Sequence, residues 1–231
     1  MSHRFYVDVP VTADTAVLTG SEARHACKVM RLQPLDELTL FDGSGREFGA
    51  RVCSIDKEVV TCDVITRNDV DRELATELIV AAALPKGDRQ KWLIQKAVEL
   101  GVRRFVPLIT DRGVAQPEHK AVQRLRRVVI EASKQCGRNV LMEVSEATPL
   151  TSVALSESTQ RVLAHPPTGT PCRTIRLSRS VCVAVGPEGG FTEAELVLAS
   201  QTGWQQVSLG PRVLRVETAA LALAAWIALD G

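Results

Sequence analysis

Residues 181–195 read VCVAVGPEGGFTEAE, and this stretch decides the fold. Its first five residues are apolar and mostly β-branched or small, without a polar face, which predicts a buried strand. The chain then breaks at the glycine-rich residues 186–190 and restarts at Thr192, where Glu195 completes the capping-box pattern of a helix start. A buried strand, a glycine-rich turn and a capped helix together form a ligand-binding element in open α/β sheets.

The glycine-rich turn favours a ligand held by the backbone. Glycine has no side chain, so backbone groups at Gly189 and Gly190 can approach a ligand closely, and we expect Glu188 beside them to face inward. A tight turn without a ligand is the alternative. The GxGxxG spacing is absent and no Lys-Ser or Lys-Thr pair follows, which argues against a bound pyrophosphate. An adenosine-bearing ligand without phosphates, such as S-adenosylmethionine, fits the turn.

Composition limits the possible classes of protein. The 231 residues suffice for one large domain or two modest ones, and a hydrophobic content of 45% supports a core. With a net charge of +1, any nucleic-acid binding depends on local basic clusters. The six cysteines form no CxxC pair and no cluster with histidine, so we expect no metal. The first residues contain no apolar stretch, and residues 219–229 are too few to span a bilayer, so we expect a cytoplasmic protein without membrane contact.

The first seventy residues have the pattern of a small β-barrel. Short apolar-alternating segments are separated by turn residues such as Asp42-Gly43, a strong hairpin signal. The predicted strands are residues 4–9, 36–41, 46–55 and 59–65. Between them, residues 21–31 predict one short helix with Ser21 as its N-cap.

A polar segment at residues 66–73 marks the predicted boundary between a domain of residues 1–70 and one of residues 71–231. Beyond it, strands and helices alternate, which predicts a mostly parallel sheet covered on both faces. The predicted strands are residues 77–84, 102–109, 161–164, 181–185 and 205–209. The predicted helices are residues 88–100, ending at Gly101, and residues 118–136, 192–202 and 217–229.

A second loop, LGPRVLRVET at residues 209–218, also follows a strand and leads into the last helix. Ligand sites of α/β sheets lie at the carboxyl ends of strands, where this loop places Arg212 and Arg215. For Arg212, a solvated surface residue is an equal alternative. Arg215 lies between Leu214 and Val216, so we expect it to be partly buried and to bind an anion or a carbonyl group. His165, followed by Pro166 and Pro167, ends another strand and is more often structural in such a position.

Two predicted helices carry basic faces. Arg24, Lys28 and Arg31 share a face of the first, and Arg124 lies opposite the apolar stripe of the helix at residues 118–136, with Arg138 just beyond it. Either face alone is ordinarily a solvated surface. Together, in a nearly neutral protein, they make contact with RNA phosphates plausible.

Four motifs in order resemble one family. GPEGGFTEAE at residues 186–195, LGPRVLRVETAAL at 209–221, QKAVELGV at 95–102 and EASKQCGRN at 131–139 are similar to the ribosomal RNA small subunit methyltransferase E family. The resemblance implies methylation of N3 of a uridine in 16S ribosomal RNA of the 30S subunit, with S-adenosyl-L-methionine as the cofactor. It also implies a homodimer, an α/β domain of the SPOUT class with a C-terminal trefoil knot, and a PUA-like β-barrel that binds RNA.

The resemblance also implies roles for particular residues. Arg215 is the expected catalytic residue, which stabilises the uridylate anion, and Glu217 is either a general base or a helix-start carboxylate. The expected cofactor-binding residues are Leu163, His165, Gly186, Pro187, Glu188, Gly189, Gly190, Leu209, Gly210, Val213, Leu214 and Thr218. The expected RNA-binding residues are Arg4, Arg24, Lys28, Arg31, Arg124 and Arg138.

Three other interpretations remain open from the sequence. Another knotted RNA methyltransferase, acting on transfer RNA or on a ribose 2′-hydroxyl, would share the fold and the cofactor. A non-catalytic RNA-binding or assembly factor would transfer no methyl group. A nucleotide-dependent oxidoreductase is disfavoured by the missing GxGxxG spacing.

Overall fold

The computed structural model describes residues 3–113, 119–165 and 170–230, which divide into two compact units. The first unit comprises Met1–Glu73 together with Ser133–Leu141, and the second comprises Leu74–Ala132 together with Met142–Gly231. Of the predicted features, Glu118, Pro166 and Pro167 lie outside the described residues.

The first unit contains a five-stranded sheet in the order β1-β3-β4-β5-β2. Its strands are β1 (His3–Tyr6), β2 (Thr15–Leu18), β3 (Glu37–Phe41), β4 (Arg46–Asp56) and β5 (Val59–Asp69). β1 pairs with β3 in parallel and the other pairs are antiparallel. The four strands expected from the sequence are present. β2 was not predicted, and β5 continues to Asp69 through residues that were predicted to form the boundary segment.

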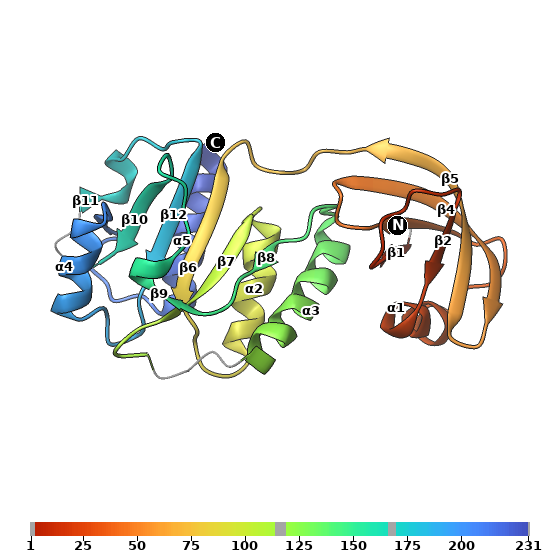
Figure 1. Ribbon diagram of the computed structural model, residues 1–231, viewed down its shortest axis with the longest axis horizontal. Helices are drawn as coiled ribbons and strands as arrows, with labels where there is room; N and C mark the ends of the chain where they lie inside the picture. Colours follow the sequence, from red (N-terminus) through yellow and green to blue (C-terminus); the bar gives the residue numbers. More distant parts are fainter. Residues whose placement is uncertain (1–2, 114–118, 166–169, 231) are drawn as a thin grey trace. The chain divides into compact units, whose positions relative to one another are not determined.

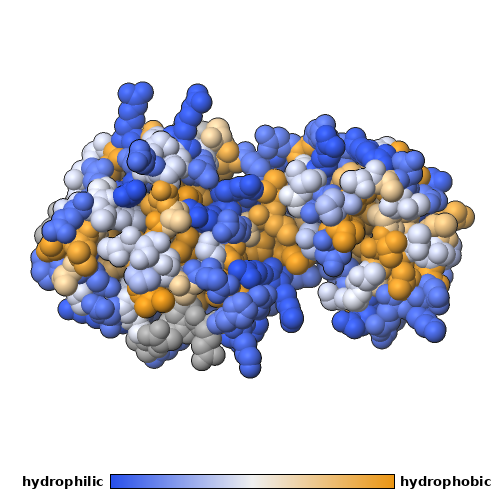
Figure 2. Space-filling view, in the orientation of Figure 1, coloured by the Kyte–Doolittle hydropathy of each residue, from blue (hydrophilic) through white to orange (hydrophobic). Residues whose placement is uncertain are grey.

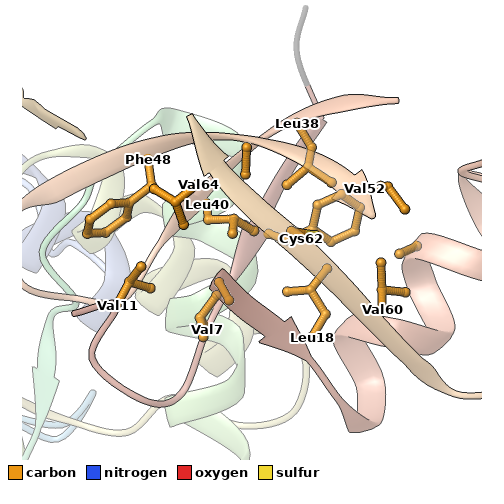
Figure 3. Close-up of a cluster of buried hydrophobic side chains, with 14 of the residues drawn as sticks. Val7, Val11, Leu18, Leu38, Leu40, Phe48, Val52, Val60, Cys62 and Val64 are labelled. Atoms are coloured by element: carbon orange, nitrogen blue, oxygen red, sulfur yellow. The ribbon is translucent and has the colours of Figure 1, made fainter. Parts of the chain in front are cut away.

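Alternating side chains of these strands fill one core (Figure 3). Leu38 and Leu40 of β3 point into it, as do Val60 and Cys62 of β5, because every second residue of a strand faces the same side. Burial raises the pKa of the Cys62 thiol to about 11, so this cysteine stays protonated and serves as a small apolar residue.

The predicted helix at residues 21–31 is two shorter elements. α1 (Gly20–Arg24) continues into a π-helix, η1 (His25–Val29), and the N-cap is Thr19 rather than Ser21. The chain enters the helix at Gly20, whose φ of 57° suits glycine. It leaves through Arg31, which has a φ of 55° although it is not a glycine. The sequence pattern gave no sign of this π-turn.

The segment Ser133–Leu141, at the end of α3 (His119–Cys136), packs within the first unit. Lys134 Nζ lies 3.0 Å from Glu22 Oε1, and Arg4 Nη2 donates to Asn139 Oδ1 at 2.8 Å. Arg138 is 4% exposed and forms an ion pair with Glu73. This burial contradicts the expectation that Arg138 contacts RNA phosphates, because its guanidinium lies inside the unit and not at the surface.

Glu47 of β4 accepts hydrogen bonds from two arginines of this unit. Arg4 Nη1 and Arg72 Nη1 donate to Glu47 Oε2 at 3.0 and 3.1 Å. Burial alone would raise the pKa of Glu47, but the hydrogen bonds from Arg72 and Arg4 outweigh it and hold that pKa below its ordinary value. Arg4, an expected RNA-binding residue, is thus mostly buried and paired with Glu47.

The second unit is built on a parallel sheet in the order β11-β13-β10-β12-β6-β7-β8, and β9 pairs with β7 beside this path (Figure 1). The longer strands are β6 (Glu77–Ala83), β7 (Arg104–Ile109), β10 (Gln160–Ala164), β12 (Ser180–Val185) and β13 (Gln205–Ser208). All five were predicted. The short strands β8 (Glu143–Val144), β9 (Thr148–Pro149) and β11 (Thr170–Pro171) were missed, because two residues carry no readable period.

Helices cover both faces of this sheet. α2 (Arg89–Glu99) and α5 (Val216–Asp230) pack on each other, and α5 packs on β6 and β12. α4 (Glu193–Gln201) covers the opposite face, where Leu196 and Ala199 join the core cluster that includes Ile79 and Ala81. Two 3₁₀ turns, η2 (Leu150–Ser152) and η3 (Cys172–Thr174), complete the unit. Within the described residues, no helix combines the length and the apolar character that crossing a bilayer requires.

Replacing Gly101 with alanine is expected to destabilise the protein by about 1–3 kcal/mol. Gly101 ends α2 at a φ of 80°, and a Cβ there would lie 2.7 Å from Leu74 Cγ. Gly203 is the matched control, since its φ is 83° but a Cβ would meet nothing within 4 Å. Urea unfolding should show a larger loss for Gly101→Ala than for Gly203→Ala, and Leu74→Ala should recover the difference. Equal losses at both glycines would contradict the steric explanation.

Candidate active site

One cavity opens where three parallel strands end. It lies at the carboxyl ends of β10, β12 and β13, the edge of the sheet at which α/β proteins bind ligands. The space that it encloses is about 610 Å³ when the open mouth is included. The lining residues are Ala164, His165, Val185, Gly186, Pro187, Glu188, Gly190, Phe191, Val207, Leu209, Gly210, Arg212, Val213, Leu214, Val216 and Ala219.

The first wall of the cavity is the glycine-rich loop after β12. Gly190 N–H donates to the Pro187 carbonyl at 2.8 Å, and Gly190 has a φ of 69°, so the loop is a tight turn that requires glycine. Thr192 then caps α4: its Oγ1 accepts from Glu195 N–H at 3.3 Å, and its own N–H donates to Glu195 Oε2 at 2.6 Å. The capping box predicted from the sequence is confirmed.

The Phe191 side chain packs between the glycine-rich loop and the core. Its ring is 4% exposed and belongs to the core on the α4 face of the sheet. A Cβ at Gly186 would lie 3.0 Å from two carbons of this ring, closer than side chains normally pack. Gly186 is therefore needed so that the loop can lie against Phe191.

The second wall is the loop after β13. Gly210, with a φ of 107°, donates its N–H to Ser208 Oγ at 3.2 Å, and Val213 is 84% exposed. The Arg215 carbonyl accepts from Ala219 N–H at 2.9 Å, so Arg215 stands at the start of α5. Its side chain is exposed. The expectation that Arg215 is partly buried is wrong: its neighbours Leu214 and Val216 are partly or fully buried, but the Arg215 side chain between them points to solvent.

The structure brings most of the predicted cofactor-binding residues around this one cavity. The predicted residues that line it are His165, Gly186, Pro187, Glu188, Gly190, Leu209, Gly210, Val213 and Leu214. Leu163 is fully buried in the core, Thr218 is exposed on α5, and Gly189 packs against Arg112. Arg215 and Glu217 flank the lining residues along the chain without belonging to them.

Arg89, at the start of α2, contacts a carboxylate from each of the two walls. The sequence did not predict this residue as part of the site. Its Nη1 lies 3.3 Å from Glu217 Oε1 and 3.9 Å from Glu188 Oε1. Glu217 is 5% exposed, and its Oε2 has no hydrogen-bond partner among the described residues. Glu188 is exposed, contrary to the expectation that it faces inward, because it turns toward Arg89 at the surface. Nothing in the sequence near Arg89 signals a contact across more than a hundred residues.

Cys182, inside β12, is a nucleophilic residue type that lies in the core and does not line the cavity. Burial raises the pKa of its thiol to about 12, which Arg104 and Arg161 only partly offset. A protonated, buried thiol is inert as a nucleophile. Among the residues that the structure describes, no three His, Cys, Asp or Glu side chains are grouped so as to hold a metal ion.

The predicted basic surface of the first unit lies around α1 and η1. Arg24 Nη1 and Lys28 Nζ are exposed and each lies 3.4 Å from a carboxylate oxygen of Glu58. Arg31 is also exposed. Hydrophilic side chains gather over α1 on the face that Figure 2 shows. In the second unit Arg124 is exposed on α3, as expected.

Comparisons with known proteins agree with this geometry. An RNA methyltransferase domain model matches residues 72–228, and an RNA methyltransferase PUA domain model matches residues 18–65. The ribosomal RNA small subunit methyltransferase E of Bacillus subtilis is 32% identical, over 90% of this chain and 88% of its own. That of Synechocystis is 34% identical, over 89% of this chain and 70% of its own.

Two solved structures extend the comparison. A putative methyltransferase of Legionella pneumophila, in complex with the bound cofactor SAM, is 31% identical with a TM-score of 0.93, covering 100% of this chain and 98% of that one. The ribosomal RNA small subunit methyltransferase E of Neisseria gonorrhoeae, bound to S-adenosyl methionine, is 30% identical with a TM-score of 0.90, covering 98% and 97%. This chain belongs to the ribosomal RNA small subunit methyltransferase E family.

Proposed function

We propose that this protein methylates N3 of a uridine in 16S ribosomal RNA within the assembled 30S subunit in the cytoplasm, with S-adenosyl-L-methionine as the methyl donor. The observation that carries the proposal is the cavity between the two glycine-containing loops in a chain of this family. We further propose that residues 71–231 carry the chemistry and residues 1–70 bind RNA, in keeping with the two domain models that match.

The residues around the cavity suit S-adenosylmethionine. Glycines at 186, 190 and 210 leave backbone groups accessible, and the lining is otherwise mainly apolar, as an adenosine requires. Glu188 at the rim supplies a negative charge that can face a cationic ligand. Bound there, the cofactor would supply its sulfonium methyl group: uridine N3, after losing its proton to water, would bond to the methyl carbon while the C–S bond breaks and leaves a neutral thioether.

Arg215 is the residue that we assign to the uridine. Its exposed side chain stands at the start of α5, next to the loop that lines the cavity, and is available to a substrate. A guanidinium beside O2 or O4 stabilises the uridylate anion and so favours loss of the N3 proton. Glu217 holds Arg89 in an ion pair, so we assign it the role of a buried helix-start carboxylate that orders the two walls.

We propose that the chain forms a trefoil knot here. β13 pairs with β10, yet α5, which follows it, packs on β6 and β12 on the other side of β10. The residues between β13 and α5 must therefore return across strands that the chain has already laid down. This path supports the knot that the family resemblance implies.

We also propose a homodimer formed through the second unit. α5 is apolar on nearly all of its faces, which is unusual for a helix at the surface of a monomer. Leu229 of α5 is 88% exposed, and Trp92 of α2, the helix packed against α5, is 46% exposed. A second copy of the chain would cover these side chains.

The decisive experiment is incubation with undermethylated 30S subunits and labelled cofactor, followed by nucleoside analysis. N3-methyluridine in 16S RNA is the expected product. Label in a ribose 2′-hydroxyl or in transfer RNA would identify another knotted methyltransferase. No transfer at all, with RNA binding retained, would identify a non-catalytic assembly factor.

Neutralising Arg24 and Lys28 together is expected to weaken RNA binding and to reduce the salt dependence of the affinity. Two lost phosphate contacts correspond to a change of about 1–2 in the slope of log K against log salt. Titrations of a 16S fragment at several salt concentrations measure the slope. The control is Arg51→Gln with Arg67→Gln, two exposed arginines of the same unit paired with Glu37 and Asp14. An unchanged slope would exclude Arg24 and Lys28 as phosphate contacts.

A further inference from the structure

The geometry assigns Arg112 as a positioning residue that holds the glycine-rich loop of residues 186–190 in its ligand-binding shape, an inference that rests on the proposed function. Arg112 follows β7 and is far from the loop in sequence. Its Nη1 donates to the Gly189 carbonyl at 2.8 Å and to the Phe191 carbonyl at 3.4 Å. One guanidinium thus connects the two carbonyl groups on either side of Gly190.

The two carbonyls that Arg112 binds flank the residue that closes the turn, Gly190. Gly190 has a positive φ and closes the turn by donating to the Pro187 carbonyl. Arg112 binds the carbonyls of Gly189 and Phe191, the residues on either side of this glycine. The remaining residues of the turn, including Gly186 and Glu188, then line the cavity.

Packing shows the same relationship as the hydrogen bonds. A Cβ placed on Gly189 would lie 3.4 Å from Arg112 Cδ and 3.5 Å from Arg112 Cβ. The aliphatic part of Arg112 therefore lies directly against Gly189. This contact explains why Gly189, although part of the motif, does not line the cavity: it receives Arg112 instead.

Arg112 is itself held in place by its neighbour. Asp111 N–H donates to Glu195 Oε1 at 3.1 Å, and Thr192 Oγ1 donates to Asp111 Oδ2 at 3.1 Å. These are the two residues of the capping box at the start of α4. The loop after β7 is thus attached both to the end of the glycine-rich loop and to the start of α4, and the described hydrogen-bond acceptors of Arg112 are carbonyl oxygens.

The test compares Arg112→Gln and Arg112→Lys with Arg103→Gln, an exposed arginine just before the amino end of β7. Calorimetry should show that Arg112→Gln raises the Kd for S-adenosylmethionine by about 10-fold or more, because a charge-assisted contact is lost. KM for the cofactor should rise likewise, with kcat at saturation little changed. Lysine should rescue only partly, since it lacks the planar fork of arginine. Arg103→Gln should match the wild type.

Hydrogen exchange separates this inference from the proposed function. Without any ligand, amides of residues 186–191 should exchange faster in Arg112→Gln than in the wild type and in Arg103→Gln. Wild-type protein that fails to bind S-adenosylmethionine would overturn the proposed function, while faster exchange in the variant would still support the role of Arg112 in shaping the loop. Unchanged exchange together with an unchanged Kd would overturn the inference, as would a loss of kcat with KM unaltered.

Discussion

Replacing Arg215 with alanine is expected to lower kcat for methyl transfer by roughly 10²–10³-fold, the usual cost of removing one preorganised donor to a developing anion. The affinity for the cofactor should stay the same, because Arg215 does not line the cavity. Its side chain is exposed, so the loss should leave stability nearly unchanged. Single-turnover kinetics with 30S subunits, together with calorimetry for the cofactor, measure both quantities.

The pH dependence gives a second readout for Arg215. Without the guanidinium the uridylate anion is less stable, so the pKa of N3 rises and the rate should reach its plateau at a higher pH than in the wild type. Arg212→Ala is the control from the same loop, since Arg212 does line the cavity. We expect it to raise KM for the cofactor and to leave the pH profile in place. Full activity of Arg215→Ala would remove Arg215 from the mechanism.

The elements that the sequence predicted well are those with a complete local signal. The strand ending at Val185 is apolar throughout, and the helix start at Thr192 carries both partners of a capping box within four residues. Gly101 and Gly190, both with positive φ, stand at the turn positions that their neighbours indicated. In each case the residues that determine the structure are adjacent in the chain.

The features that the sequence did not reveal depend on distant partners. Arg89 and Arg112 each reach across the fold to the glycine-rich loop or its neighbours, and neither lies in a recognisable pattern. The sequence of α3 and the residues after it predicts a basic, solvated surface, yet Lys134 near the end of α3 and Arg138 just beyond it pair with Glu22 and Glu73 inside the first unit. Basic residues in a sequence usually indicate a solvated surface, but a basic side chain can be buried when it pairs with a carboxylate that is distant in the chain.

Replacing Gly186 with alanine is the second change for which we expect a large effect. The added Cβ would lie 3.0 Å from Phe191 Cδ2 and Cε2, and Phe191 is locked in the core. Either the loop or the ring must move, at a cost of about 1–3 kcal/mol. If the loop moves, the Kd for S-adenosylmethionine should rise roughly 5- to 150-fold. Calorimetry measures the Kd, and urea unfolding shows how much of the cost falls on stability.

A double variant distinguishes this collision from a general intolerance of the loop. Gly186→Ala with Phe191→Leu removes the aromatic carbons that the new Cβ would meet, so the two changes should be strongly non-additive and restore part of the affinity. Gly190→Ala is the contrast, since its Cβ would meet nothing within 4 Å and only the φ of 69° is strained. Phe191→Leu should therefore not rescue Gly190→Ala. Rescue at both glycines, or at neither, would mean that the contact between Gly186 and Phe191 does not shape the cavity, and Arg112 alone would then have to account for the form of the loop.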